Sequence, residues 1–252
     1  MPNEYKNTFS KIVSEKNDLI IFLKTKIDSD TIGGEIIEVL PSKELVDFSN
    51  MIAVEKASKM MSFNQNLNPR SNEVIISNLC RGILGEAALQ LLLINYIKIT
   101  TNDIIRFDLE RETFDYVPTE YDLKYKNKRI EVRTSNNKFE SLDKYINSNE
   151  NGVICKYINN IKQAEKDSDY YFAIVYDYPG KIGPISDRSR ANFVSDILNK
   201  EIKMYIITGA NLAESKKYGI TKNLGQNNTK YLIINFSNCR NIYKVLEEIK
   251  KI

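Results

Sequence analysis

The residues best suited to chemistry lie in one short stretch, where charged side chains occupy positions typical of strands. Residues 120–135 read EYDLKYKNKRIEVRTS, and a two-residue turn at 127–128 predicts a β-hairpin. Side chains two apart on a strand share a face, so the charged residues of both strands project together. In this register the expected cross-strand pairs are Lys124 with Glu131 and Asp122 with Arg133.

The two carboxylates of this hairpin predict a site for a divalent cation. Asp and Glu are disfavoured within strands, and crowding two of them costs energy unless positive charge compensates. Mg²⁺, with Mn²⁺ as a substitute, prefers such oxygen ligands and also binds phosphate. The alternative is that Asp122 and Glu131 are exposed charges on an edge hairpin, balanced by Lys124 and Arg133. If the first strand is shifted, Asp115 or Glu120 replaces Asp122.

A resemblance to a known family rests on these residues and on an upstream helix. An aspartate, a Glu-Val-Arg-Thr-Ser nine residues later and the helical sequence GILGE at 82–86 together resemble the PD-(D/E)XK nuclease superfamily, over residues 80 to about 236. The resemblance implies a restriction endonuclease-like core, a mixed sheet flanked by helices. It implies metal ligands at Asp122, Glu131 and Val132, with Glu86 as a possible helical acid in the metal site. The alternative for Glu86 is a solvated glutamate on the helix surface. The region of Lys162 and Gln163 contributes to the site in some relatives.

The motif departs from the family at the position of its lysine, which positions the attacking water. Arg133 stands there, and arginine stays protonated near neutral pH, so it can hold a phosphate but cannot act as a general base. In the register above, Lys124 could reach the place that the lysine normally fills. The alternative is that Lys124 forms only a cross-strand charge pair with Glu131. The candidate catalytic residues are therefore Asp122, Glu131, Arg133, Lys124 and Glu86.

Composition excludes several classes of enzyme. The chain of 252 residues contains no histidine, which removes Ser-His-Asp hydrolases, HExxH zinc enzymes and histidine-dependent nucleases. Three scattered cysteines, Cys80, Cys155 and Cys239, suggest neither a zinc ribbon nor a disulfide framework, and we expect them reduced and packed. The N-terminus lacks the plan of a signal peptide, and no apolar run approaches a membrane span, which predicts a soluble, cytoplasmic protein.

The remaining pattern predicts an α/β fold with a mixed central sheet flanked by helices. Apolar spacing indicates helices over 42–61, 73–97, 152–167, 191–200 and 240–251, and strands over 17–27, 33–40, 170–178, 203–209 and 230–236. The polar patch at 64–72 is the best candidate boundary, although it could be only a long loop. We therefore expect an N-terminal extension, 1–70, for recognition or dimerisation, and a nuclease core, 71–252.

Together these features predict a Mg²⁺-dependent endodeoxyribonuclease, most specifically a type II restriction enzyme acting as a homodimer on double-stranded DNA. The net charge of +3 permits a nucleic-acid partner without requiring one. Two polar loops are candidates for DNA contact through Lys181, Arg188, Arg190, Gln226 and Asn227, with Lys222, Asn223 and Asn228 beside them. The rivals are a repair or junction-resolving nuclease and an inert DNA-binding protein that kept the fold.

Overall fold

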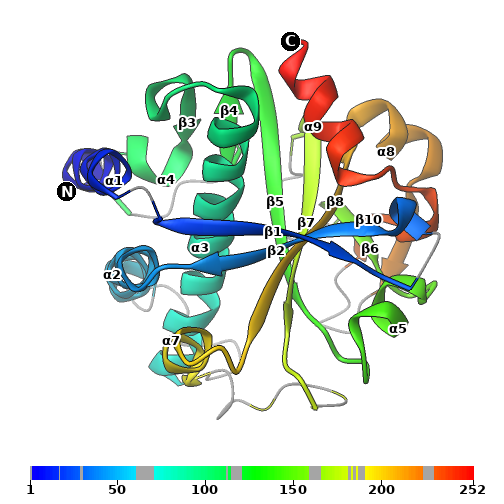
Figure 1. Cartoon of the computed structure of the whole chain (residues 1–252), viewed down its shortest axis with the longest axis horizontal. Helices are drawn as coiled ribbons and strands as arrows, with labels where there is room; N and C mark the ends of the chain where they lie inside the picture. The colour runs from blue at the N-terminus through cyan, green and yellow to red at the C-terminus, as the bar shows by residue number, and fades with distance from the viewer. Residues whose placement is uncertain are drawn as a thin grey trace.

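A seven-stranded mixed sheet forms the centre of the molecule (Figure 1). The computed structural model describes residues 2–16, 18–28, 31–60, 71–111, 113–114, 121–158, 166–180, 183, 186, 191–223 and 230–252. In spatial order the strands are β1 (Ile20–Lys26), β2 (Glu35–Pro41), β8 (Lys203–Asn211), β7 (Tyr170–Asp177), β5 (Lys128–Asn136), β4 (Leu123–Tyr125) and β3 (Ile104–Arg106). The pair β5–β7 is parallel, and the other neighbouring strands are antiparallel. The predicted α/β class with a mixed sheet is confirmed.

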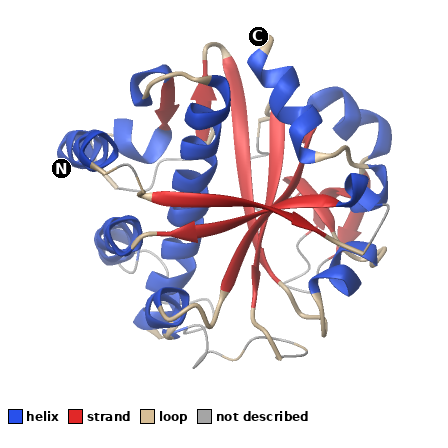
Figure 2. Cartoon of the chain, in the orientation of Figure 1, coloured by secondary structure: helices blue, strands red, loops and turns tan. Residues whose placement is uncertain are grey.

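Helices cover one face of this sheet and a smaller sheet covers part of the other (Figure 2). The helical side holds α1 (Pro2–Glu15), α2 (Lys43–Met60), α3 (Asn72–Ile97), α4 (Phe107–Glu110), α7 (Phe193–Leu198) and α9 (Ile242–Lys250). The opposite side holds β6 (Gly152–Ile158), β9 (Ile220–Asn223), β10 (Lys230–Asn235), α5 (Leu142–Asn147) and α8 (Leu212–Tyr218). Short 3₁₀ turns lie at Thr31–Gly34, Thr101–Asp103 and Phe236–Asn238.

Strand β7 shows how two cores form on one sheet. Its side chains alternate, so that Phe172 and Ile174 face the helical side while Tyr171 and Val175 face the smaller sheet. The strand is buried on both faces, as its apolar sequence predicts for a central strand.

Helix α3 is the central helix of the helical layer. Ser71 caps its first turn by accepting a hydrogen bond from the Val74 N–H, and the helix ends at Lys98 in the left-handed conformation. It is long and apolar enough to cross a membrane, but 67% of its most apolar window is buried inside the fold. That burial is typical of a core helix in a soluble α/β protein.

The predicted helix over 152–167 is wrong for the part that the structure describes. Residues 152–158 form strand β6, which pairs antiparallel with β10. The apolar spacing there also fits a strand, because Val153 and Cys155 alternate with half-buried residues and face the second core. Pairing with β10, a strand distant in the sequence, decides the outcome, and local spacing cannot reveal it.

The N-terminal segment, residues 1–70, shares the sheet and the core of the remainder wherever it is described. Strand β2 pairs antiparallel with β8, and helix α2 packs beside α3. The boundary predicted near position 70 falls within 61–70, outside the described residues.

Candidate active site

The hairpin of β4 and β5 has a different register from the predicted one. Leu123 pairs with Ile130 and Lys124 pairs with Arg129, so the turn is at Lys126-Asn127, with Lys126 in the left-handed region at φ 50°. The predicted pairs of Lys124 with Glu131 and of Asp122 with Arg133 are therefore wrong. Hairpin turns of this length need positive φ at a central residue, and Lys126 adopts it without the glycine that would signal it.

The register error leaves the charged residues on the same face. Each cross-strand partner moves by two residues, and a shift of two keeps the alternation of side chains along a strand. Leu123 pairs with Ile130, so the next residues outward on the two strands, Asp122 and Glu131, lie beside each other. The predicted register placed Asp122 opposite Arg133. The carboxylates of Asp122 and Glu131 therefore lie closer together than the predicted register implied.

Asp122 and Glu131 form a contacting carboxylate pair. Oδ2 of Asp122 accepts a hydrogen bond of 2.7 Å from the Val132 N–H, and its carboxyl also contacts the Glu131 side chain. An Arg133 nitrogen lies 2.9 Å from Oε1 of Glu131, and the Glu131 and Arg133 side chains are only 14% and 16% exposed. The alternative of exposed charges on an edge hairpin is therefore wrong, and β3 lies outside β4 in the sheet.

Burial raises the pKa of Asp122 above its usual value. The positive charge of Arg133 and the Val132 N–H act in the opposite direction, and the negative charge of Asp108 reinforces the rise. Arg133 and the Val132 N–H therefore compensate the negative charge of the Asp122 carboxylate only in part.

Glu86 approaches the same carboxylate from α3. Its pKa is raised well above the usual value, first by burial and then by the charges of Asp122 and Asp108. The helix can come this close because Gly85 faces β5: a Cβ atom added there would lie 2.7 Å from Cγ2 of Thr134. Glu86 thus belongs to one electrostatic group with Asp122.

Further charged groups surround Glu86 on the helical side. The carboxylate of the buried Asp108 forms ion pairs with Lys56, at 2.6 Å, and with Arg111, at 3.3 Å. The Arg106 guanidinium is buried over the ring of Phe9, 4.6 Å from its centroid, and its charge and that of Lys56 lower the pKa of Glu86. None of these residues was predicted from the sequence. The alternation of apolar and acidic residues in FDLE, at 107–110, is a signal for Asp108, and no comparable signal marks Lys56 or Arg106.

In the part of the chain that the structure describes, no three carboxylates or thiols are close enough to form a metal site on their own. The groups that could hold a cation are the carboxylate pair, with Glu86 as the third acid near Asp122. The raised pKa values of Asp122 and Glu86 show that the site gains from added positive charge, which is the property a cation site requires.

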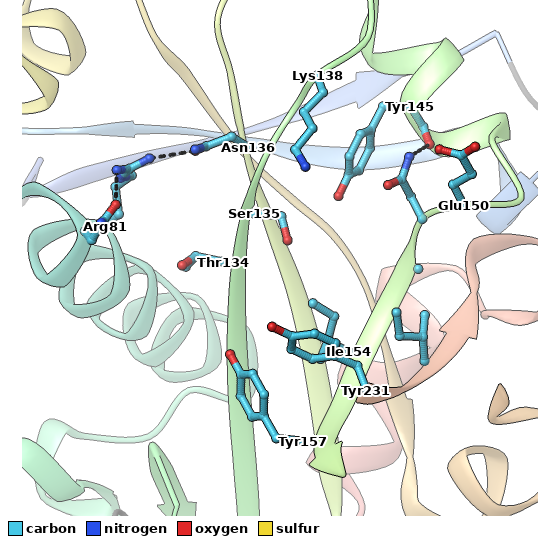
Figure 3. Close-up of a pocket in the computed structure, with 14 residues that line it drawn as sticks. Arg81, Thr134, Ser135, Asn136, Lys138, Tyr145, Glu150, Ile154, Tyr157 and Tyr231 are labelled. Carbon is cyan, nitrogen blue, oxygen red and sulfur yellow. Dashed lines mark hydrogen bonds between the residues drawn. The ribbon is translucent and has the colours of Figure 1, made fainter. Parts of the chain in front are cut away.

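A polar cleft adjoins the carboxylate pair along β5. β5 pairs with β4 only over residues 128–130, while its pairing with β7 continues to Asn136. Beyond the hairpin contact, the described residues therefore leave one edge of β5 without a paired strand. At this edge a cavity of about 390 Å³ opens between α3 and the smaller sheet (Figure 3). We call it the β5 cleft, and its walls include Arg81, Ser135, Lys138, Tyr145, Tyr157 and Tyr231.

Arg133 links the carboxylate pair to this cleft. Its guanidinium carbon lies 4.7 Å from the ring centroid of Tyr157, which lines the cleft, and Tyr157 lies beside Tyr231 with their centroids 4.7 Å apart. A cation over an aromatic face is held in place by electrostatic attraction. The Arg133 side chain is thus fixed between Glu131 and the aromatic wall of the cleft.

The predicted DNA-contact residues Lys181, Arg188, Arg190, Gln226, Asn227 and Asn228 lie outside the described residues, as do Lys162, Gln163, Asp115 and Glu120. Lys222, which is described, donates to Oδ1 of Asn235 at 2.9 Å and to the Asn149 carbonyl, so it bridges β9 to β10 and the loop before β6. Asn223 ends β9 opposite Lys230.

The cysteines are free thiols, and two of them are packed as expected. Cys80 and Cys155 are buried and Cys239 is half-buried. Burial raises the pKa of Cys80 to about 12 and that of Cys155 to about 11, so both stay protonated near neutral pH.

Comparison with known proteins gives one relative. The chain is 21% identical over 270 aligned positions to an uncharacterized protein of the archaeon Methanocaldococcus jannaschii, covering 99% of this chain and 92% of the relative. No family model matches the chain, and no solved structure matches it. The near-complete coverage indicates that the likeness between the two proteins extends from α1 to α9.

Proposed function

We propose that this chain is a Mg²⁺-dependent endodeoxyribonuclease of the PD-(D/E)XK kind, most specifically a type II restriction endonuclease. The observation that carries the proposal is the contact between the Asp122 and Glu131 carboxyls, with the charge of Glu86 acting on Asp122, at an open sheet edge beside a polar cleft. Paired carboxylates next to a phosphate-accessible groove are what metal-assisted phosphodiester hydrolysis requires.

The residues present fit a divalent cation. Raised pKa values at Asp122 and Glu86 mean that ionising both acids is unfavourable without added positive charge. Asp122 and Glu131 would hold Mg²⁺, with the Val132 carbonyl next to Glu131 on the same strand, and Glu86 would add negative charge to the site from α3. A bound Mg²⁺ supplies Lewis acidity toward a phosphate oxygen and toward water.

The order of elements supports the resemblance. Helix α3, with the GILGE sequence, precedes the hairpin that carries the carboxylate pair, and β7 follows it parallel to β5 in one mixed sheet. Two features depart from the resemblance: Asp122 lies just before β4 rather than within it, and residues 152–158, expected as a helix after the motif, form strand β6.

Arg133 would bind the phosphate and orient it. Its guanidinium keeps its proton near neutral pH, presents planar donors and is held between Glu131 and Tyr157. In this arrangement Arg133 supplies positive charge beside the carboxylate pair without acting as a base, so the acceptor for the proton of water is a carboxylate.

The test is digestion of plasmid DNA with Mg²⁺, followed by sequencing of the fragment ends. Discrete fragments support a restriction enzyme, and cleavage of branched DNA alone supports a junction-resolving nuclease. Asp122→Asn or Glu131→Gln should abolish cleavage in Mg²⁺, since each removes a charged ligand. Glu140→Gln is the matched control, because that exposed acid pairs with Lys144 away from the site. Wild-type rates in either site variant would refute the assignment.

One observation favours the rival of an inert DNA-binding protein. Arg133 stands in place of the motif's lysine and its charge is shared with Glu131 at 2.9 Å. Retained DNA affinity with no cleavage in Mg²⁺ or Mn²⁺ would support this rival. We further propose a cytoplasmic homodimer, because a palindromic target matches a two-fold symmetric protein.

A further inference from the structure

The β5 cleft is a built cavity that the metal chemistry does not use. Its volume of about 390 Å³ falls within the range of small-molecule sites, roughly 300–1,000 Å³, and far exceeds what a bound water needs. It is bounded by α3 on one side, by the last residues of β5 behind, and by β6 and β10 on the other side. Figure 3 shows the cleft with β5 between the helix and the smaller sheet.

The cleft gathers hydrogen-bond donors at one end. In Figure 3 the side chains of Ser135, Lys138 and Tyr145 point into the same space. Burial raises the pKa of Tyr145 to about 12, so its hydroxyl stays protonated, and that hydroxyl contacts Ser135. Lys138 is exposed at the rim and forms no ion pair with any described residue. Such a group of neutral and charged donors suits a phosphate.

Arg81 adds a fixed positive charge to the helical wall. Its guanidinium donates to Oδ1 of Asn136 at 2.9 Å, to the Ser77 carbonyl at 3.3 Å and to the Asn78 side chain. These acceptors are neutral, and the guanidinium also lies over the Phe193 ring, 5.5 Å from its centroid, so its orientation is fixed. Held by both α3 and the end of β5, Arg81 is only 4% exposed.

The remaining walls suit the other parts of a nucleotide. Tyr157 and Tyr231 form a paired aromatic wall across β6 and β10, and a sugar or base can pack against this wall beside the Arg133 guanidinium that lies over Tyr157. Glu150 also lines the cleft, and a carboxylate accepts from the exocyclic amino group of a base. Its negative charge disfavours a bare anion and favours a ligand that has both a phosphate and a donor.

We propose that the β5 cleft binds one nucleotide of a DNA strand, with its phosphate toward Lys138 and Arg81 and its base toward Glu150. This deepens, and rests on, the proposed nuclease function. Thr134 and Ser135 directly follow Arg133 on β5, so a strand whose scissile phosphate lies at Arg133 passes the mouth of the cleft. An unstacked neighbouring nucleotide would fix the register of the strand at the carboxylate pair.

The experiment measures binding of single nucleotides to the full chain in EDTA, by saturation-transfer NMR and calorimetry. The ligands are deoxynucleoside 5′-monophosphates, the corresponding nucleosides and inorganic phosphate. The monophosphates should bind, with thymidine monophosphate the weakest because thymine lacks the exocyclic amino group that adenine, cytosine and guanine all have. Each partial ligand should bind at least about tenfold more weakly, the loss expected for one charge-assisted hydrogen bond. Equal binding of phosphate and nucleotide would make the cleft an anion site only and overturn the proposal.

Variants locate the binding. Lys138→Ala and Tyr157→Ala should each weaken nucleotide binding about tenfold, and Tyr157→Phe should retain most of it because the ring remains. The matched controls are Lys144→Ala, on α5, and Tyr218→Ala, an exposed tyrosine on α8, and neither should change binding. Unchanged affinity in both cleft variants would overturn the proposal.

Failure of this proposal and failure of the nuclease proposal look different. If DNA is cleaved in an Asp122-dependent way but no nucleotide binds in EDTA, the cleft proposal fails alone. If nucleotides bind at the cleft but DNA is never cleaved, the nuclease proposal fails and the cleft remains a nucleotide site.

Discussion

At the scale of single residues, the acids around α3 and β5 are an unfavourable arrangement when no cation is present. Glu86 and Asp122 both have raised pKa values, because burial and the neighbouring acid Asp108 oppose ionisation. A folded-state pKa above the unfolded value means that the folded protein binds more protons than the unfolded chain. The stability that such a group contributes is complete below its unfolded pKa and is lost as pH rises through its folded pKa.

This gives a prediction for stability against pH. From the ordinary glutamate value of 4.5 upward, Glu86 should cost the folded state an increasing free energy in EDTA, and Mg²⁺ should reduce that cost. Thermal unfolding at pH 5 and pH 8, with and without Mg²⁺, measures this. Glu86→Gln should flatten the fall in Tm between the two pH values.

The control for this measurement lies on the same helix. Glu73, in the exposed first turn of α3, has a lowered pKa from hydrogen bonds with its own backbone N–H and with Ser71, so its contribution has the opposite sign. In the Glu73→Gln variant, Tm should still fall between pH 5 and pH 8 as it does in the wild type. If Glu86→Gln and Glu73→Gln behave alike, Glu86 does not carry the effect.

A second prediction distinguishes Lys124 from Arg133 as the residue that takes the role of the motif's lysine. Lys124 pairs with Arg129 across the hairpin, whereas Arg133 lies 2.9 Å from the Glu131 carboxylate. Arg133→Ala should lower the single-turnover cleavage rate by at least about 100-fold, as loss of a preorganised transition-state donor does. Lys124→Ala should stay within a few-fold of wild type, and the reverse pattern would assign the role to Lys124.

At the scale of elements, local sequence patterns predicted long helices and strands well but predicted the pairing between strands poorly. Helix α3 and strand β7 are long and strongly patterned, and both were predicted close to their bounds. Strand β6 was predicted as a helix, because its identity depends on pairing with β10. The turn of the hairpin was predicted at 127–128 and lies at 126–127. Lys126 adopts a positive φ there, which its residue type does not signal. The carboxylate pair survived that error because the shift preserved its face.

The two glycines of α3 give an element-scale prediction with an internal control. A Cβ at Gly85 would lie 2.7 Å from the stiff, β-branched Thr134, while a Cβ at Gly82 meets nothing within 4 Å. Gly85→Ala should push α3 from β5, costing about 1–3 kcal/mol of unfolding free energy, and lower cleavage by moving Glu86. Gly82→Ala should raise stability by up to about 1 kcal/mol through helix propensity. Urea unfolding of both variants measures this, and equal effects would contradict the close approach of α3 to β5.

At the scale of the whole molecule, the sheet crosses the boundary that the sequence suggested. The polar stretch before Ser71 resembles a linker, but β2 pairs with β8, which lies far later in the chain. Nothing local in GGEIIEVL identifies that partner, so local spacing offers no signal for it. The carboxylate pair depends on this arrangement, because β8 supports β7 and β7 supports β5.

The last prediction concerns removal of the N-terminal segment, residues 1–70. In this segment the side chains of Ile37, Val39, Leu45, Val46 and Ile52 are at most 2% exposed and belong to the main core. Burying one such side chain contributes about 1.5–3 kcal/mol. Together they match or exceed the whole stability of a typical domain, about 5–15 kcal/mol.

A chain of residues 71–252 should therefore lack a cooperative thermal transition and near-UV tyrosine circular dichroism, whereas the full chain should show both. A truncation that removes only residues 1–16 is the control, because it deletes α1 and leaves every strand of the sheet in place. That shorter truncation should melt cooperatively at a lower Tm, since Phe9 leaves the core. A cooperative transition in the 71–252 chain would instead establish the N-terminal residues as a separable module, added to a core that folds and positions Asp122 and Glu131 by itself.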